Sequence, residues 1–371
     1  MSDERLLETF LDLVRIDSPS GKEAVCAAHC ARILESLGFA VRFDDSASVT
    51  GSDVGNLIAE RPGQLPAVFA LSAHLDCVDP CCGVIPRIED GIVISAGETI
   101  LGADDKSGLA ASLETFRRLV ELGVPLPTLK AIFTVQEERG LVGAKHLDPT
   151  DAACDLCLVL DAEGRPGAIV VAAPTHYTFV AEFEGKASHA GVAHELGVSA
   201  IRMATDAISR MQLGRLDDAT TANIGSVHGG TATNVIAAHC EVRGECRSLD
   251  PERVEAVKAA MHEALVAAAR VAGGNVEIAW KREYVGFRFS PDHPLVQLVS
   301  AACRDAGIEP STFNTGGGSD ANVLAGMGVP ALALACGMQG VHGTSEQIAV
   351  ADLVAMTEIC VATCLRLAEE R

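Results

Sequence analysis

Two adjacent glutamates, Glu137 and Glu138, come one residue after an apolar stretch, IFTV. Like charges at neighbouring positions repel one another, and burial beside an apolar strand makes the repulsion worse. The pair therefore belongs either to a solvated turn or to a site where a positive charge compensates it. If the chain leaves extended geometry at Glu137, the two side chains need not point to opposite faces.

Other residues of metal-ligand type also stand where an apolar, strand-like run has just ended. AVFALSAHLD ends in His74 and Asp76, which share one face of a strand because they are two residues apart. Asp76 can therefore accept a hydrogen bond from one ring nitrogen of His74 and leave the other nitrogen for a metal. The remaining candidates are Asp104 and Asp105 in LGADDKSG, Asp161 in CLVLDAEG and His342 in GMQGVHGTSE.

Two histidines and several carboxylates on successive loops suit zinc, cobalt or manganese. Each signal also has an ordinary structural explanation when it is taken alone. A strand-end histidine can be structural, an Asp-Asp pair before a helix can cap that helix, the glutamate pair can be solvated, and Asp161 can be a turn residue. Their joint placement at strand ends favours a metal centre.

The elements that must position these residues alternate along the chain. Near-continuous apolar strands such as AVFALSAHLD, KAIFTV and DLCLVLD are separated by helical patterns such as KSGLAASLETFRRLVEL. This alternation predicts an α/β fold with a mixed, largely parallel sheet and helices on both faces. Folds of this kind bind ligands at the carboxyl ends of their strands.

The pattern changes near His176, where TFVAEFEG alternates apolar and polar residues. The order strand, helix, two strands, helix, strand predicts an inserted α+β domain, with a small antiparallel sheet backed by helices on one side. Helix-strand alternation returns after Pro291. We therefore predict one domain over 1–175 and 288–371, interrupted by an inserted domain over 176–287.

Composition narrows the class of protein. Of the 371 residues 48% are hydrophobic and only 4% are aromatic, so a large aliphatic core is expected. A formal net charge of −21 argues against nucleic acid or an anionic membrane as a partner. The sequence shows neither an apolar run of the ~18 residues that a membrane span needs nor a signal-peptide pattern. The 13 scattered cysteines favour free thiols in a reducing compartment, the cytoplasm.

The motifs taken together resemble the M20 metallopeptidase family, and within it the peptidase T-like group. The order H-x-D, L-G-A-D-D-K-x-G, E-E, a strand-end Asp and G-x-H-G-T-x-E carries the resemblance, with support from RIDSPSGKE, GKASHAG, GGTATNVI and GGGSDANVLAGMG. The likeness spans nearly the whole chain. It implies a zinc-exopeptidase-like fold whose inserted domain serves as a lid and forms a homodimer.

Transferred residue by residue, the resemblance implies a site for two divalent metal ions, Zn²⁺ with Co²⁺ or Mn²⁺ as alternatives. Asp104 would bridge the ions. His74 and Asp161 would complete one ion's ligands, and Glu138 and His342 would complete the other's.

The resemblance also implies roles beside the ions. Asp76 would orient His74, and Glu137 would be the general base for a metal-activated water. The peptide bond after Asp104 is expected to be cis, and Asp105 is expected to begin a helix rather than bind metal.

The inserted domain and the last third of the chain offer candidates for substrate contact. The resemblance implies that His189, in GKASHAG, reaches a neighbouring subunit's active site and stabilises the oxyanion. Asn234 and Arg247 match positions that bind polar groups of the substrate; Arg247 can hold a carboxylate or be a solvated strand-edge charge. The amides of Gly317 and Gly318 can cradle a carboxylate or form only a tight turn.

The resulting expectation is a cytoplasmic exopeptidase of short peptides, either an aminopeptidase or a tripeptidase. Two alternatives remain open at this point. One is an M20-type amidohydrolase that removes the acyl group of N-acyl amino acids with the same metals and base. The other is a non-catalytic relative that binds metal or amino acids, and Glu137 argues against it because a binding protein needs no base.

Overall fold

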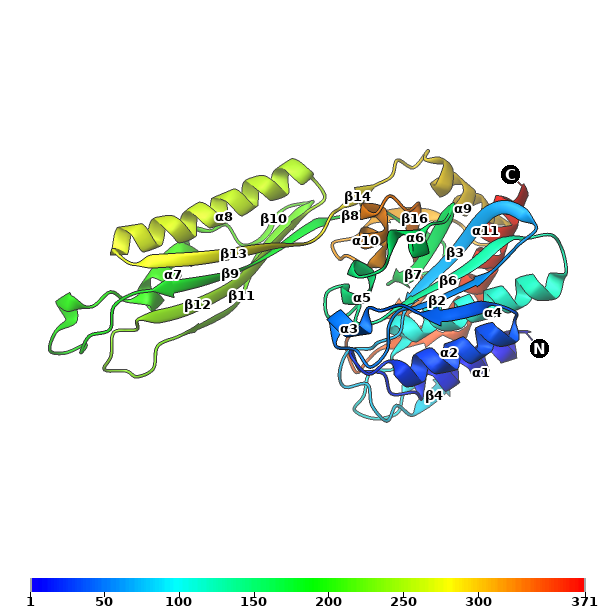
Figure 1. Cartoon of the computed structure of the whole chain (residues 1–371), viewed down its shortest axis with the longest axis horizontal. Coiled ribbons are helices and arrows are strands. Elements are labelled where there is room, and N and C mark those ends of the chain that lie inside the picture. Colours follow the sequence, from blue (N-terminus) through cyan, green and yellow to red (C-terminus); the bar gives the residue numbers. More distant parts are fainter. Residues whose placement is uncertain (1, 370–371) are drawn as a thin grey trace. The chain divides into compact units, whose positions relative to one another are not determined.

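The computed structural model describes residues 2–369, which divide into two compact units (Figure 1). The first unit holds the residues up to Val171, Phe289–Asn314 and the residues from Ser319 onward. The second unit holds Ala172–Arg288 and the glycine-rich stretch Thr315–Gly318. The expected roles of these parts stay predictions: a metal-binding domain over residues 1–175 and 288–371, and an inserted lid and dimerisation domain over residues 176–287.

Among the described residues, a mixed sheet of nine strands belongs largely to the first unit, in the order β1-β2-β6-β3-β7-β16-β8-β14, with β15 paired to β8. β3 pairs in parallel with β6 and β7, and β7 pairs in parallel with β16. The α/β class with a largely parallel centre is thereby confirmed. The strands are β1 (Ala40–Phe43), β2 (Leu57–Arg61), β3 (Leu65–His74), β6 (Pro127–Thr134), β7 (Leu156–Ala162), β8 (Ala168–Ala173), β14 (Phe287–Arg288), β15 (Ser311–Asn314) and β16 (Ala331–Ala335).

Helices cover this sheet, and a small second sheet lies beside it in the order β17-β18-β5-β4. Helices α4 and α11 both contact β3, and α10 contacts β16. The helices are α1 (Ser2–Val14), α2 (Ala24–Ser36), α3 (Ala47–Thr50), α4 (Ala103–Leu122), α5 (Val142–Lys145), α6 (Pro149–Ala152), α9 (Pro294–Asp305), α10 (Asp320–Gly326) and α11 (Val350–Glu369). The small strands are β4 (Pro86–Glu89), β5 (Ile92–Ser95), β17 (Met338–Gln339) and β18 (Gln347–Ala349).

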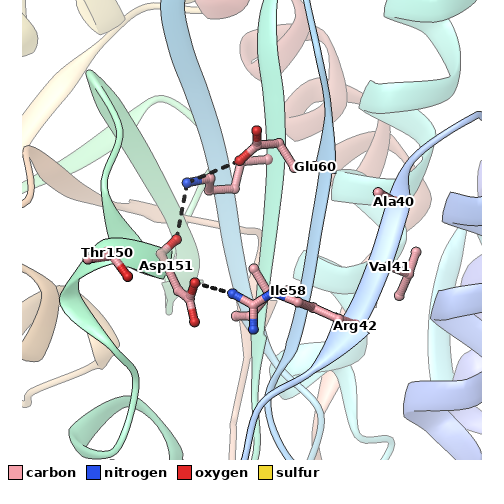
Figure 2. A pocket seen from close by; sticks show the side chains of 8 residues that line it. Ala40, Val41, Arg42, Ile58, Glu60, Thr150 and Asp151 are labelled. Carbon is pink, nitrogen blue, oxygen red and sulfur yellow. Dashed lines mark hydrogen bonds and ion pairs between the residues drawn. The ribbon is translucent and has the colours of Figure 1, made fainter.

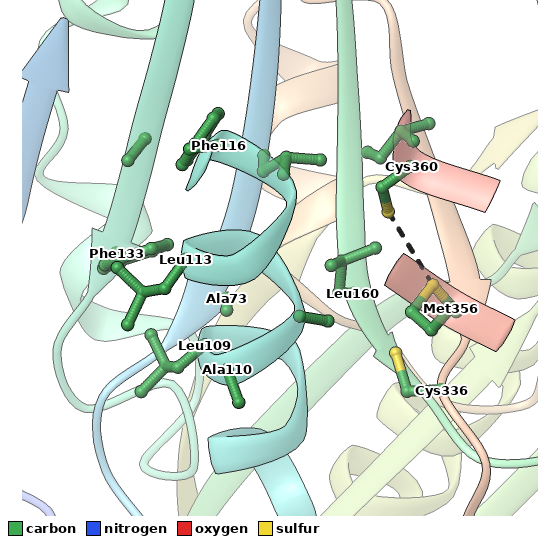
Figure 3. Packing of buried hydrophobic residues seen from close by; sticks show 14 of the residues in the cluster. Ala73, Leu109, Ala110, Leu113, Phe116, Phe133, Leu160, Cys336, Met356 and Cys360 are labelled. Carbon is green, nitrogen blue, oxygen red and sulfur yellow. Dashed lines mark hydrogen bonds between the residues drawn. The ribbon is translucent and has the colours of Figure 1, made fainter. Parts of the chain in front are cut away.

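The core of the first unit is aliphatic, as the composition predicts. Leu109, Leu113 and Phe116 recur every three to four residues along α4, so they share one face of the helix. They are fully buried in one cluster with Phe133 of β6 and Met356 of α11 (Figure 3). This packing fixes the start of α4 against the ends of the central strands, which is where the candidate ligands lie.

The second unit is an antiparallel sheet in the order β10-β11-β12-β9-β13, with α7 and α8 packed on it. Along β12, Cys240, Val242 and Cys246 are buried while Glu241 and Arg243 face outward, so alternate residues meet the helices. The elements are β9 (Thr175–Glu184), η1 (His194–Leu196), α7 (Ala200–Arg210), β10 (Gly214–Asp217), β11 (Thr220–Gly229), β12 (His239–Ser248), α8 (Pro251–Ala272) and β13 (Asn275–Tyr284).

A hollow of about 320 Å³ lies at the edge of the large sheet, against α6 (Figure 2). Its charged groups are paired with one another. Arg42 forms an ion pair with Asp151, and Lys130 Nζ lies 3.5 Å from Glu60 and donates to the Asp151 carbonyl at 3.1 Å. The charged groups that line this hollow therefore connect the sheet edge to α6, and they lie away from the candidate ligands. Between residues 2 and 369, no helix is long and apolar enough to cross a bilayer.

Candidate metal centre

The candidate ligands of the first unit come from the same edge of the sheet. Four central strands, β6, β3, β7 and β16, run parallel to one another, so their carboxyl ends meet there. His74 is the last residue of β3, and Asp161 is the last but one of β7. Glu138 follows β6, and His342 lies on the loop between β17 and β18, shortly after β16.

Asp104 lies between the two histidines at the start of α4. One of its oxygens, Oδ1, is 3.0 Å from His74 Nε2, and the other, Oδ2, is 3.3 Å from His342 Nε2. His74 Nε2 is also 3.7 Å from Asp161 Oδ1, and His342 Nε2 is 2.9 Å from Glu138 Oε1. One carboxylate thus joins two sets of donors, as a ligand shared by two ions would.

Three groups of donor atoms meet within 4.8 Å: His74, Asp104 and Asp161; His74, Glu137 and Glu138; and Asp104, Glu138 and His342. All five predicted ligands and Glu137 are therefore brought together. The chemistry of the donors, imidazole nitrogen and carboxylate oxygen, suits divalent ions of the zinc type.

The electrostatics of the cluster also fit cations. Burial, followed by the charge of Glu137, raises the pKa of Asp161 well above its usual value. Burial likewise raises the pKa of Glu137, against the charge of His74. Glu138 Oε1 is buried and accepts no well-aligned hydrogen bond from the described residues, although His342 Nε2 is near. These carboxylates lack enough positive charge from the chain, and two dications would supply it.

The carboxylates near the histidines favour the protonated form of the imidazole. Contacts with Asp104 and Glu138 raise the pKa of His342 to about 10. Burial opposes ionisation of Asp104, but its contacts with His342 and His74 outweigh burial and lower the pKa of its carboxyl. A bound ion would replace the proton that this arrangement otherwise places on the imidazole.

The orientation of His74 differs from the expectation. Its Nδ1 lies 2.9 Å from the backbone oxygen of Asp76 and 3.5 Å from the Asp76 carboxylate. The nearer acceptor is therefore the carbonyl, which keeps the proton on Nδ1 and leaves Nε2 to face Asp104. Asp76 therefore contacts His74 mainly through its main chain, with its carboxylate slightly farther away.

The Asp76 carboxylate also holds the glutamate pair. Its Oδ1 accepts the N–H of Glu137 at 2.9 Å, its Oδ2 accepts the N–H of Glu138 at 3.3 Å, and the Ser20 hydroxyl also donates to it. Gln136 has φ +50°, so the chain leaves extended geometry just before the pair. This turn lets the carboxylates of Glu137 and Glu138 approach the same site.

Two further side chains hold the same turn, and the sequence did not reveal them. Glu23 is fully buried; its Oε1 accepts the N–H of Gln136 at 3.1 Å, and Ser52 donates to its Oε2. Asn56 Oδ1 accepts the N–H of Val135 at 3.0 Å. Glu23 belongs to the stretch SPSGKE, but nothing in that motif says which backbone groups it will meet.

The segment around Asp104 is also held by carboxylates. The peptide bond between Asp104 and Asp105 is cis, as expected. Asp105 is buried and accepts the N–H groups of His74 at 3.2 Å and Gly108 at 3.0 Å, so it supports the start of α4. Glu346 accepts two more N–H groups here and was likewise missed, although it ends the quoted motif G-x-H-G-T-x-E.

In the second unit, the segments of His189 and Asn234 lie side by side. Val235 pairs with His189 in an isolated bridge, and Ala190 donates to the Asn234 carbonyl at 2.9 Å. Both predicted side chains are exposed. His189 Nδ1 accepts the N–H of Gly191 at 3.2 Å.

The guanidinium group of Arg247 already makes contacts within the chain, so less of it can bind a substrate than the sequence suggests. Glu245 accepts from its Nε at 3.0 Å and its Nη2 at 2.9 Å, while Nη1 lies 3.5 Å from the Tyr284 hydroxyl. His176 Nε2 lies 3.0 Å from the same Glu245 carboxylate. Contact with His176, and then with Arg247, lowers the pKa of Glu245 to about 2.

The glycine run lies against the same tyrosine. A Cβ at Gly318 would come within 2.2 Å of the Tyr284 ring, so only glycine fits there. Gly317 donates to the Thr315 hydroxyl at 3.0 Å. A Cβ at Gly316 would meet nothing within 4 Å, so packing inside the chain does not explain that glycine.

Known proteins resemble this chain over its full length. Residues 173–272 match the peptidase dimerisation domain of the M20 family. The chain is 42% identical to the Bacillus subtilis protein YqjE, over 98% of each chain. It is 25% identical to a peptidase T of Clostridium perfringens, over 97% of this chain and 88% of that protein.

Solved structures of peptidases also superpose on this chain over nearly its full length. The aminopeptidase PepT from Bacillus cereus superposes with a TM-score of 0.92 and 43% identity, covering 99% of both chains. A tripeptidase from Staphylococcus aureus superposes with a TM-score of 0.94 and 35% identity, covering 100% of this chain and 99% of its own. A dinuclear metal-binding M20 peptidase from Bacillus subtilis shares the fold, with a TM-score of 0.74 and 18% identity over 99% of both chains.

Proposed function

This chain belongs to the M20 peptidase family, in its peptidase T-like branch, and on that premise we propose that it is a two-metal exopeptidase that removes residues from the amino end of short peptides. The observation that carries the proposal is the position of Asp104, which offers one oxygen to each of two histidine-containing donor sets. Glu137 lies within the same cluster. Aminopeptidase and tripeptidase relatives at 43% and 35% identity support the reaction class.

His74 and Asp161 would hold one divalent ion, Glu138 and His342 the other, and Asp104 both. Zn²⁺ is the ion we propose, with Co²⁺ and Mn²⁺ as substitutes that the same donors accept. When bound, the two ions would act as Lewis acids that polarise the scissile carbonyl and lower the pKa of the attacking water.

Glu137 is the proposed general base. Its side chain is buried and meets the donor set of His74 and Glu138. The bond from its N–H to Asp76 fixes the backbone from which the carboxylate projects. The carboxylate takes a proton from the attacking water and delivers it to the nitrogen of the leaving amine.

The second unit is proposed to bind the rest of the substrate and to form a homodimer. The Nη1 group of Arg247 would meet a substrate carboxylate, with Asn234 and the amides of Gly317 and Gly318 as further donors. His189 would reach the partner's site and stabilise the oxyanion. The match of residues 173–272 to a dimerisation domain supports the pairing of two copies.

The test is metal-dependent release of amino acids. Protein stripped of metal and then reloaded with Zn²⁺, Co²⁺ or Mn²⁺ is assayed on unblocked tripeptides and on N-acetyl amino acids. We expect release of the first residue from the tripeptides only after reloading. Hydrolysis of the N-acetyl amino acids alone would make the chain a deacylase, and failure on both substrates would make it a binding protein.

A cytoplasmic location is part of the proposal. All 13 cysteines are free thiols, and 11 of them are buried. A chain of this kind suits a reducing compartment, where thiols stay unpaired.

A further inference from the structure

Glu346 is a buried carboxylate that bonds only to main chain among the contacts described for it. Its side chain is 1% exposed. Its Oε2 accepts the N–H of Gly102 at 2.6 Å, and its Oε1 accepts the N–H of Asp104 at 2.9 Å. The two oxygens thus hold the backbone on both sides of Ala103, immediately before the carboxylate of Asp104.

The same glutamate closes the loop that carries His342. The His342 side chain is 53% exposed and its φ is +63°, so neither burial nor a regular element fixes it. Glu346 follows four residues later, and its N–H donates to the Gly343 carbonyl at 3.0 Å. At the other end of the loop, Gly340 donates to the Glu163 carboxylate at 3.0 Å.

Glu346 therefore links two segments that lie 244 residues apart in the chain, one with Asp104 and one with His342. These two residues share an ion only if the loop sits at a fixed distance from the start of α4. His74 and Asp161, by contrast, are carried by strands of the central sheet and need no such link.

We propose that Glu346 is a positioning residue that couples the His342 loop to Asp104 and thereby sets the affinity for the ion held by Asp104, Glu138 and His342. This inference rests on the two-metal centre of the proposed function. Glu346 is the last residue of the motif G-x-H-G-T-x-E. It is not one of the proposed metal ligands, and the inference gives it a positioning role beside them.

Glu346→Gln tests the coupling with little change in size. An amide has one oxygen, so it accepts one of the two N–H groups and turns its own N–H₂ toward the other. The matched control is Glu114→Gln. Glu114 is also a fully buried glutamate, but it faces Arg5, Arg117 and Arg118, about three turns further along α4.

The measurement is titration of metal-free protein with Co²⁺, followed by visible absorbance and calorimetry without substrate. We expect two equivalents to bind to the wild type and to Glu114→Gln. In Glu346→Gln one equivalent should bind as in the wild type, and the affinity for the other should fall about 10- to 100-fold, as for other residues that orient metal ligands. Thermal unfolding of the metal-free proteins separates this effect from a general loss of stability.

Three results would overturn the inference: both equivalents binding to Glu346→Gln within twofold of wild type, equal weakening of both, or the same selective loss in Glu114→Gln. If Glu346→Gln does not fold, Glu346→Asp carries the test, because it keeps both oxygens but is one methylene too short to reach both N–H groups. Unchanged binding in that variant would also overturn the inference. A wild type that binds two ions yet hydrolyses no peptide would refute the proposed function and leave the coupling intact.

Discussion

Glu137 and Glu138 are sequence neighbours with different surroundings. Glu138 faces His342, with its Oε1 2.9 Å from the ring nitrogen. Glu137 is 8% exposed and lies with His74 in the donor cluster, and burial raises the pKa of its carboxyl. At the residue scale, these surroundings support the proposal that Glu138 binds an ion and Glu137 moves a proton.

We expect Glu137→Gln to keep both metal ions and to lower kcat by about 10²- to 10⁴-fold, because only the proton acceptor is removed. Glu138→Gln is the control and should lose affinity for one ion. Metal content by elemental analysis and kcat on a tripeptide check both variants. Loss of metal from Glu137→Gln would reverse the assignment of base and ligand.

Glu245 gives a prediction for stability at low pH. Its folded pKa of about 2 lies below the ~4.3 of an unfolded glutamate, so its ionised form favours the fold. That contribution is complete above about pH 4.3 and is lost as the pH falls toward 2. The Tm difference between wild type and Glu245→Gln should therefore shrink over this window, as thermal scans at each pH would show. A constant difference would contradict the shifted pKa.

The clustering of the candidate ligands could be predicted from the sequence because each follows a recognisable strand or belongs to a motif. The residues that hold the ligand backbones could not. Glu23, Asn56 and Glu346 act on N–H groups distant in the chain, and hydrogen bonds of this kind leave no periodic pattern. Asp76 shows the same limit, since its motif predicted the contact with His74 but not the bonds of its carboxylate to the glutamate turn.

At the scale of elements, the turn after β6 is held by side chains on four successive N–H groups, those of residues 135–138. Backbone groups in a strand would bond to a neighbouring strand. Here they bond to buried acceptors from the N-terminal segments and from the end of β3, so the geometry of the turn depends on charge and burial outside the sheet.

We expect Glu23→Gln to lower the free energy of unfolding by about 1–3 kcal/mol, because a buried N–H loses its charged acceptor. The exposed Glu35→Gln, on the helix that follows Glu23, should stay within about 0.5 kcal/mol of wild type. Urea unfolding of the metal-free proteins measures both changes. Equal effects in the two variants would mean that the Glu23 bond to Gln136 contributes nothing.

The strand and helix pattern was predictable because each element shows its own period. Apolar runs mark the parallel strands, and alternation marks the antiparallel sheet of the second unit. The grouping of Thr315–Gly318 with the second unit was not predictable, since it depends on how Gly318 packs against Tyr284.

At the scale of the whole molecule, the proposed dimer makes each active site depend on two chains. Glu137→Gln and His189→Ala should each be nearly inactive alone. After subunit exchange, the mixed dimer regains one complete site, so activity should return to about a quarter of wild type for random pairing. The measurement is tripeptide hydrolysis before and after mixing. Recovery would be absent if His189 acted within its own chain.

The N–H of Gly102 meets a carboxylate that the chain supplies only 244 residues later. During synthesis on the ribosome, the segment with Asp104 is therefore made long before the glutamate that holds it. His74 and Asp161 are also made early, whereas His342, Glu346 and the central strand β16 (Ala331–Ala335) come from the last 41 residues. The proposed two-ion site would therefore be complete only after nearly the whole chain has been made.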